Sequence, residues 1–258
     1  MNLVQHNAVY NMLSLGIASM LFTSLFLWIA RDRVLPKFRM AVMVSATVTS
    51  IAAYHYFRMF DSFKEAYPVG GTVDAGFAGY NVGYRYVDWL LTVPLLLVEL
   101  VAVMGLARAM QKSLLTRLVP AAAAMIILGY PGDMHTDLWG IPNVGWAILS
   151  TIPFLYILYV IFIEIGKSLA AQSERVQRLL KGARLLLLAT WGVYPITFAI
   201  SLGQGTAAPS FDAVVAREIG YSIADILAKC AFGLIIFTVA RIKSAEENKE
   251  FAATEFKD

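Results

Sequence analysis

The sequence contains one cysteine, Cys230, and only three histidines in 258 residues. A single cysteine excludes an intramolecular disulfide framework, and the scattered histidines His6, His55 and His135 show no spacing typical of a structural metal site. Charged side chains make up only 15% of the chain and hydrophobic ones 59%, whereas about a quarter of the residues in a soluble domain are charged. The sequence therefore predicts an integral membrane protein without a bound metal.

The net charge of +3 is small. The basic residues of the chain fall in short segments between apolar runs, so membrane topology explains their positions better than a nucleic-acid partner does. No basic stretch precedes the first apolar run, and no small-residue cleavage site follows it, so we expect no removed signal peptide.

Seven apolar segments have about the 20 residues that a helix needs to cross a hydrocarbon core. The sequence therefore predicts an all-α fold, a bundle of seven transmembrane helices that forms a single domain over residues 1–258. The charged tail, 244–258, is expected to be flexible. The seven segments lie near 8–30, 38–60, 80–107, 114–131, 141–166, 178–202 and 213–241.

Most of the 21 basic residues follow the first, third, fifth and seventh segments. By the positive-inside rule these connections are cytoplasmic, which puts the N-terminus outside a plasma or inner membrane and the C-terminus inside. The longest outer connection, 61–84, is rich in glycine and tyrosine and contains a Gly-Gly pair. That composition predicts a short extracellular hairpin between the second and third helices, although it also fits a plain polar loop.

Asp225 and Lys229 lie one helical turn apart inside the last apolar segment. A charged side chain costs about 2.5 to 3.5 kcal/mol at the centre of a membrane helix, so its default interpretation is functional. In the third segment Arg85, Asp88 and Glu99 share one helical face with Thr92, because their spacings are close to whole turns. These carboxylates could form a ladder of proton-binding groups.

Two interpretations of the charges remain open. Asp225 and Lys229 could form an inert ion pair while Asp88 pairs with Arg85. Alternatively, Lys229 condenses with an aldehyde to an imine, whose charge Asp88 and Asp225 balance. Glu99, near a helix end, could equally extend to the membrane interface, and His55 alone fits a packing role.

An aromatic stripe adds a candidate pocket. Trp191, Tyr194 and Phe198 recur at spacings of three and four on the sixth segment, where Pro195 predicts a kink. Such a stripe is often plain core packing. Trp89, next to Asp88, favours a pocket with flat walls for a long conjugated ligand.

The chain resembles the microbial (type I) rhodopsins over essentially its whole length. The motifs that carry the resemblance are "RYVDWLLTVPLLLVEL", "WGVYPITF", "STIPFLYILYVIF" and "DILAKCAFG". The resemblance implies seven helices around all-trans retinal, bound as a protonated Schiff base to Lys229. It also implies that Asp88 is the primary proton acceptor and counterion and Asp225 the second counterion.

The residues Asp88, Thr92 and Glu99 match the pattern of the proteorhodopsin and xanthorhodopsin branch of outward proton pumps. The resemblance therefore implies that Glu99 is the proton donor and that His55, Arg85 and Thr92 are associated with the acceptor. Sodium and chloride pumps carry other residues at these positions. For the retinal pocket the resemblance implies Trp89, Leu96, Met125, Ser150, Trp191, Tyr194, Pro195 and Phe198.

Further expectations follow from the same resemblance. Leu96 goes with green absorption in this branch. Gly203 and Arg217 fall near the positions of the paired glutamates that release protons in archaeal pumps, so early proton release is not expected. A carotenoid antenna is disfavoured, because Ala147 stands where a glycine opens a window in some relatives. Family members commonly form pentamers or trimers.

The sequence thus predicts a light-driven outward proton pump, a transporter of protons in the lipid bilayer and not an enzyme. Two alternatives remain: a sensory photoreceptor with the same chromophore, and a retinal-free seven-helix receptor or transporter. Sensors generally lack a carboxylate donor, so Glu99 favours the pump over the first of these.

Overall fold

A computed structural model describes residues 1–134, 138–196 and 210–255 of the chain. Two long helices contain a π-helical turn: α6 continues through η3 (Val160–Glu164) into α7, and α10 continues through η5 (Ile226–Ala231) into α11. Shorter elements are η1 (Arg31–Arg33), α3 (Val73–Gly79), η2 (Leu138–Gly140), η4 (Leu169–Ala171) and α12 (Lys249–Glu255). The long helices are α1 (Leu3–Ala30), α2 (Pro36–Ala66), α4 (Gly83–Val103), α5 (Arg108–Asp133), α6 (Asn143–Tyr159) with its short continuation α7 (Ile165–Ser168), α8 (Glu174–Trp191), α10 (Phe211–Asp225) and α11 (Phe232–Glu247).

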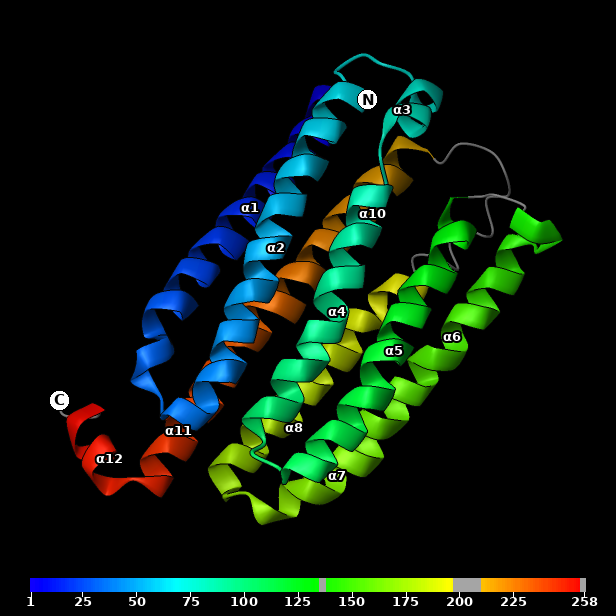
Figure 1. The fold of residues 1–258 in the computed structure, drawn as a ribbon. Coiled ribbons are helices and arrows are strands. Elements are labelled where there is room, and N and C mark those ends of the chain that lie inside the picture. Colours follow the sequence, from blue (N-terminus) through cyan, green and yellow to red (C-terminus); the bar gives the residue numbers. More distant parts are fainter. Residues whose placement is uncertain (135–137, 197–209, 256–258) are drawn as a thin grey trace.

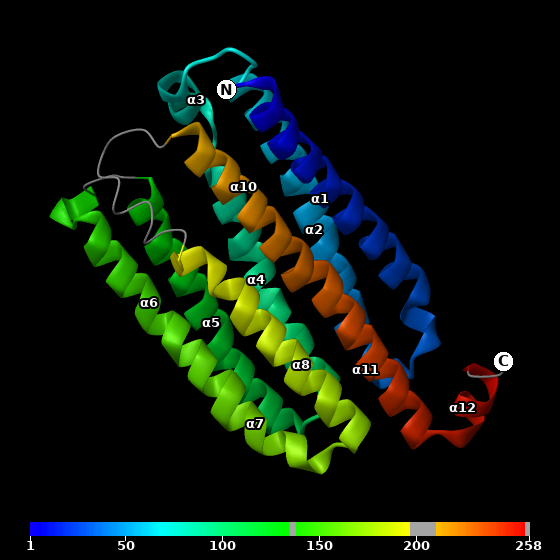
Figure 2. The ribbon, with the colours of Figure 1, turned by 180° about the vertical axis from the view of Figure 1, so that it is seen from behind.

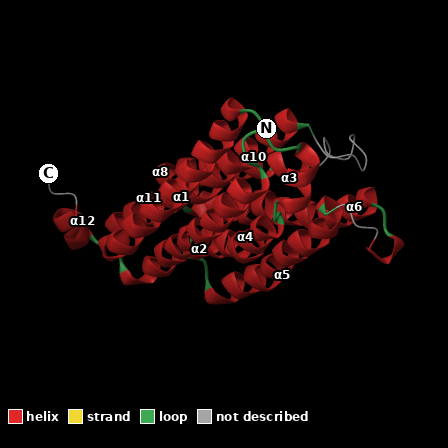
Figure 3. Cartoon of the chain, turned by 90° about the horizontal axis from the view of Figure 1, so that it is seen from above, coloured by secondary structure: helices red, strands yellow, loops and turns green. Residues whose placement is uncertain are grey.

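These helices form the expected seven-helix bundle. They run side by side, with the N-terminus and α3 at one end and α12 at the other (Figures 1 and 2). Within the described residues six helices are long and apolar enough to cross a membrane, and α8, which is less apolar, packs with them as the seventh helix of the bundle. Within the three described ranges the structure contains no strand (Figure 3). The predicted all-α fold is confirmed.

The outward faces of the helices are apolar. Phe22 and Ile29 on α1 are 66% and 79% exposed, and Ile152 and Leu155 on α6 are 62% and 57% exposed. Large apolar side chains at such exposure are costly in water but favourable against lipid. The bundle is therefore a multi-pass membrane protein whose interior, not its surface, carries the polar groups.

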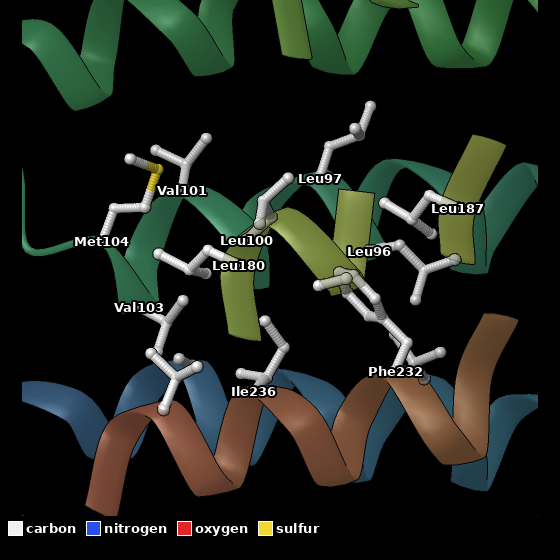
Figure 4. Packing of buried hydrophobic residues seen from close by; sticks show 14 of the residues in the cluster. Leu96, Leu97, Leu100, Val101, Val103, Met104, Leu180, Leu187, Phe232 and Ile236 are labelled. Atoms are coloured by element: carbon white, nitrogen blue, oxygen red, sulfur yellow. The ribbon is translucent and has the colours of Figure 1, made fainter. Parts of the chain in front are cut away.

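The interior near the predicted cytoplasmic end is filled by a layer of aliphatic and aromatic side chains from α4, α8 and α11. Figure 4 shows Leu180 and Leu187 of α8 lying between α4 and α11. We call this cluster the apolar layer. Its members are Leu96, Leu97, Leu100, Val101, Val103, Met104, Leu180, Leu187, Phe232 and Ile236.

The connection 61–84 differs from the hairpin that its composition predicted. It contains the short helix α3, whose first turn is capped by the Thr72 hydroxyl, 3.4 Å from the backbone N–H of Ala75. Gly76 packs against Tyr67 so closely that a Cβ there would lie 2.2 Å from the ring. The Gly-Gly pair does make a turn, with φ +83° at Gly70, but it leads into a helix because the threonine cap and the close glycine contact stabilise one.

The other end of the bundle holds three short turns, at 31–35, 104–107 and 169–173, and the C-terminal helix α12. Glu255 of α12 lies 2.7 Å from Nε of Arg33 and 2.9 Å from Nη2 of Arg241. The tail up to Glu255 is thus helical and ion-paired, and its flexibility stays a prediction.

Candidate functional site

Lys229 lies in the middle of the bundle, where its side chain is 1% exposed. Its Nζ donates to Oδ2 of Asp88 over 2.8 Å and to Oδ1 of Asp225 over 2.6 Å. α4 supplies Asp88, and the π-helical turn η5, which begins directly after Asp225, carries Lys229 four residues beyond it. The structure thus brings together three charged residues that the sequence placed on two separate helices.

Asp225 has many more hydrogen-bond donors than Asp88. Its Oδ2 accepts from the hydroxyl of Tyr56 at 2.9 Å and from Arg85 at 3.3 Å. Its Oδ1 accepts from the indole of Trp89 at 3.2 Å and from the hydroxyl of Tyr194 at 2.8 Å, in addition to Lys229. Five donors to one carboxylate favour its ionised form.

Asp88 is completely buried, yet only Lys229 donates to its carboxylate, and its Oδ1 has no hydrogen-bond partner among the described residues. The hydroxyl of Thr92 donates to the backbone carbonyl of Asp88 and not to its carboxylate. Nδ1 of His55 lies 4.0 Å from Oδ1 of Asp88, beyond hydrogen-bond distance, and 3.0 Å from the carbonyl of Ile51. A buried carboxylate oxygen without a partner is where an ordered water is expected.

Arg85 connects this centre to a second buried carboxylate. Its Nη2 donates to Glu218 at 2.7 Å, and Glu218 also accepts from the hydroxyl of Tyr80 at 2.9 Å and from Nε of Arg217 at 3.3 Å. Arg85 and Glu218 are 2% and 1% exposed. The guanidinium thus bridges Asp225 in the middle of the bundle and Glu218 toward the predicted outer end.

A cavity of about 290 Å³ opens beside Lys229 and Asp225. That volume is close to the lower end of the range for small-molecule sites. Its walls are mostly aromatic and aliphatic, and Lys229 is among the lining residues, so an apolar conjugated aldehyde fits the lining and the one amine in it. Phe198 lies outside the described residues. The other residues predicted for a retinal pocket all line the cavity: Trp89, Leu96, Met125, Ser150, Trp191, Tyr194 and Pro195.

Glu99 lies on the side of Lys229 that faces the predicted cytoplasmic end, opposite to Glu218. It is eleven residues from Asp88 along α4, or about 16 Å at 1.5 Å per residue. It is completely buried, beside the apolar layer. The hydroxyl of Ser45 on α2 donates to its Oε2, and Oε1 has no hydrogen-bond partner among the described residues. A buried carboxyl group with one hydroxyl partner is suited to hold a proton and not a charge.

Glu218, Tyr56 and Ser45 were not predicted from the sequence. Glu218 precedes Asp225 by seven residues, which is close to two helical turns, so a search for polar residues on the face of Asp225 could have found it. Tyr56 has no such signal. Its ring packs against Gly16 of α1, where a Cβ would lie 2.4 Å away, and only the fold reveals that contact.

The chain matches the family model for bacteriorhodopsin-like proteins over residues 7–243. It is 30% identical over 228 residues to the green-light absorbing proteorhodopsin of a gamma-proteobacterium, covering 86% of this chain and 82% of that protein. Among solved structures it resembles xanthorhodopsin, described as a light-driven ion pump with dual chromophore, with a TM-score of 0.86 and 44% identity over 96% and 97% of the two chains. The rhodopsin of Exiguobacterium sibiricum has a TM-score of 0.80 and 31% identity over 95% and 99%.

Proposed function

The chain belongs to the bacteriorhodopsin-like family of microbial rhodopsins, and we propose that it is a light-driven pump that moves protons outward from Glu99 through the centre at Lys229 to Asp88. The observation that carries this proposal is the position of the Lys229 nitrogen, 2.8 Å from Asp88 and 2.6 Å from Asp225 at the wall of an apolar cavity. The related proteins include a proteorhodopsin and a light-driven ion pump, which supports the same activity here.

Lys229 is the residue that would hold all-trans retinal, as a protonated Schiff base. When bound, retinal supplies absorption of visible light and a change of shape that alters the proton affinity of the lysine nitrogen. Trp89, Trp191 and Tyr194 line the cavity and would limit the space available for that change. We propose green absorption, because Leu96 lines the cavity. We propose no carotenoid antenna, because the methyl group of Ala147 lines the same cavity.

The unequal hydrogen bonding of the two carboxylates assigns their roles. Asp225 accepts from five side chains and would lose several bonds on protonation, so it stays an anion. Asp88 would lose only the bond from Lys229, the group that gives up the proton. We therefore assign Asp88 as the acceptor, and His55, 4.0 Å away, as a neighbour that changes the field at Asp88 when it gains a proton.

Glu99 is the group that restores the proton from the cytoplasmic side. Its burial and its single hydroxyl partner Ser45 favour the neutral, protonated form at rest. A sensory photoreceptor would need the chromophore site but no such proton store. A retinal-free receptor would need neither the aromatic walls nor a lysine nitrogen that lines them.

The decisive experiment uses the protein reconstituted with all-trans retinal in a suspension of cells. Illumination should acidify the medium, and a protonophore should abolish the signal. Lys229→Ala is the matched control, which should give no colour and no acidification. A coloured wild-type protein that leaves the external pH unchanged in light would instead favour the photoreceptor.

A further inference from the structure

Two consecutive residues of α11 are hydrogen-bonded to all three turns at the predicted cytoplasmic end. Ser244 accepts from the backbone N–H of Leu35, which precedes α2, at 2.9 Å. Lys243 donates from Nζ to the carbonyl of Met104 at the end of α4 over 2.7 Å, and to Oε1 of Gln172 before α8 over 2.8 Å. Lys243 and Ser244 are 7% and 0% exposed, so the lysine and serine ends of these bonds are buried, whereas Leu35 and Gln172 are half-buried.

Lys243, Met104 and Gln172 are connected to one another by three hydrogen bonds. Nε2 of Gln172 donates to the same Met104 carbonyl at 3.2 Å, so the three residues bond one another in a triangle. Gly105 follows with φ +65°, and a Cβ there would lie 3.3 Å from Nζ of Lys243. The α4–α5 turn therefore folds tightly over the ammonium group in a conformation that favours glycine.

The triangle lies over the inner path to Glu99. Met104 is five residues beyond Glu99 on α4, or about 7.5 Å along the axis, and it belongs to the apolar layer. The side chains that separate Glu99 from this end include apolar residues of α4, α8 and α11 (Figure 4). Lys243 connects the ends of these same three helices.

We propose that Lys243 is a positioning residue that keeps this entrance closed, and that proton uptake by Glu99 requires its ammonium group to release the turn that carries Gln172. Both acceptors of the ammonium group are uncharged, so water can replace them when the turn moves. The inference rests on the proposed pump function, because it concerns the step in which Glu99 regains a proton.

The test measures proton uptake after a light flash, with a pH-indicating dye, in retinal-reconstituted wild type and Lys243→Met. Loss of the charge-assisted bonds should make opening easier and speed uptake about tenfold, a change that corresponds to about one such bond. The release of protons to the other side should keep its rate. Lys181→Gln, which removes the same charge from an exposed position on α8, should leave both rates unchanged. Uptake that is unchanged or slower in Lys243→Met would overturn the proposal.

A second measurement needs no light. Hydrogen–deuterium exchange in the dark should speed up in Lys243→Met at the amides of 104–108 and 172–177, and not elsewhere in α4 or α8. Gln172→Leu, which keeps the lysine bonded to Met104, should speed exchange at 172–177 and also carries the test if Lys243→Met does not fold. Uniformly faster exchange in both variants, with wild-type uptake, would leave only a structural role and refute the proposal.

The proposed pump function and the proposed role of Lys243 can be refuted separately. A wild-type protein that does not acidify the medium would refute the pump, whereas the dark exchange pattern would still report on the contact. A wild-type protein that pumps, with both variants equal to it in uptake and exchange, would refute only the role of Lys243.

Discussion

Arg85 donates to the carboxylate of Glu218 over 2.7 Å in a part of the bundle where both side chains are at most 2% exposed. The same guanidinium reaches Asp225 at 3.3 Å. One cation thus neutralises parts of two buried anions, and its place between them depends on both. A charge change at either carboxylate should therefore be felt at the other.

Glu218→Gln should lower stability strongly. The variant leaves the buried Arg85 and the half-buried Arg217 without their shared carboxylate, and breaking one partner of a buried ion pair costs about 3 to 5 kcal/mol. A clear drop in the thermal midpoint of the reconstituted protein would show this. Glu65→Gln, at an exposed position near the same end of the bundle, is the control and should change the midpoint little. Equal midpoints for the two variants would contradict a structural role for the pair.

Asp88→Asn should keep its colour and lose outward pumping, because the lysine nitrogen then has no acceptor for its proton. Asp225→Asn should behave differently. It removes the acceptor of five hydrogen bonds, so pigment formation itself should become weaker. Absorption spectra and light-driven acidification separate the two variants, and sustained acidification by Asp88→Asn would rule out its assignment.

Glu99→Gln should slow the return of a proton from the inside by about 100-fold or more, the usual contribution of a positioned acid. Ser45→Ala should act in the same direction but less, because it removes only the hydroxyl partner of Glu99. Flash kinetics at several pH values provide the measurement. If Glu99→Gln regains its proton at the wild-type rate, another group is the donor.

Gly16→Ala should disturb the retinal site from the far side of α2. The added Cβ would lie 2.4 Å from the ring of Tyr56, whose hydroxyl donates to Asp225. Overpacking costs about 1 to 3 kcal/mol, and a displaced Tyr56 should shift the absorption maximum. Gly182→Ala, where nothing lies within 4 Å, should stabilise slightly and keep the wild-type spectrum. A normal spectrum in Gly16→Ala would mean that Tyr56 does not tune Asp225.

Tyr67 should make stability depend on alkaline pH. It lies just beyond the end of α2, and burial raises the pKa of its hydroxyl to about 12. The folded protein thus holds this proton more tightly than the unfolded chain, so the stabilisation is complete below about pH 10 and is lost as the pH rises toward 12. The hydroxyl has no hydrogen-bond partner within the described ranges, so Tyr67→Phe should match the wild type at pH 7. The variant should lose less stability between pH 10 and 12, measured by chemical denaturation.

Hydropathy and charge placement were sufficient to predict the helices from the sequence, but they did not predict the structure of every connection. The seven apolar segments became seven helices because a membrane leaves a backbone few other ways to satisfy its hydrogen bonds. The hairpin predicted for 61–84 was wrong, because its glycine pair was visible in the sequence and the packing of Gly76 on Tyr67 was not. The π-helical turn at Lys229 also lacks a sequence signal, since it depends on neighbouring helices.

The charged centre was predictable only in part. The spacing of Asp225 and Lys229 gave their mutual contact, but only the fold shows which carboxylate is rich in donors and which is poor. Thr92 was predicted to be associated with the acceptor, and only the fold shows that its hydroxyl donates to the backbone carbonyl of Asp88 and not to the carboxylate. Glu218 has a helical spacing that could have revealed it, whereas Ser45 is one serine among many until α2 packs against α4.

The part of the apolar layer that lies between Glu99 and the predicted inner end, from Leu100 to Met104 on α4, has an electrical consequence. Most of the voltage across the membrane should fall over this apolar part, because the charged groups Arg85, Asp225 and Glu218 lie in the middle of the bundle and toward its predicted outer end. One elementary charge crossing the full potential costs about 2.3 kcal/mol per 100 mV. We therefore expect a patch-clamp current–voltage curve that is steep because of the proton-uptake step and that depends little on the proton-release step. These apolar residues would then be the part of the protein that makes pumping sensitive to the membrane potential.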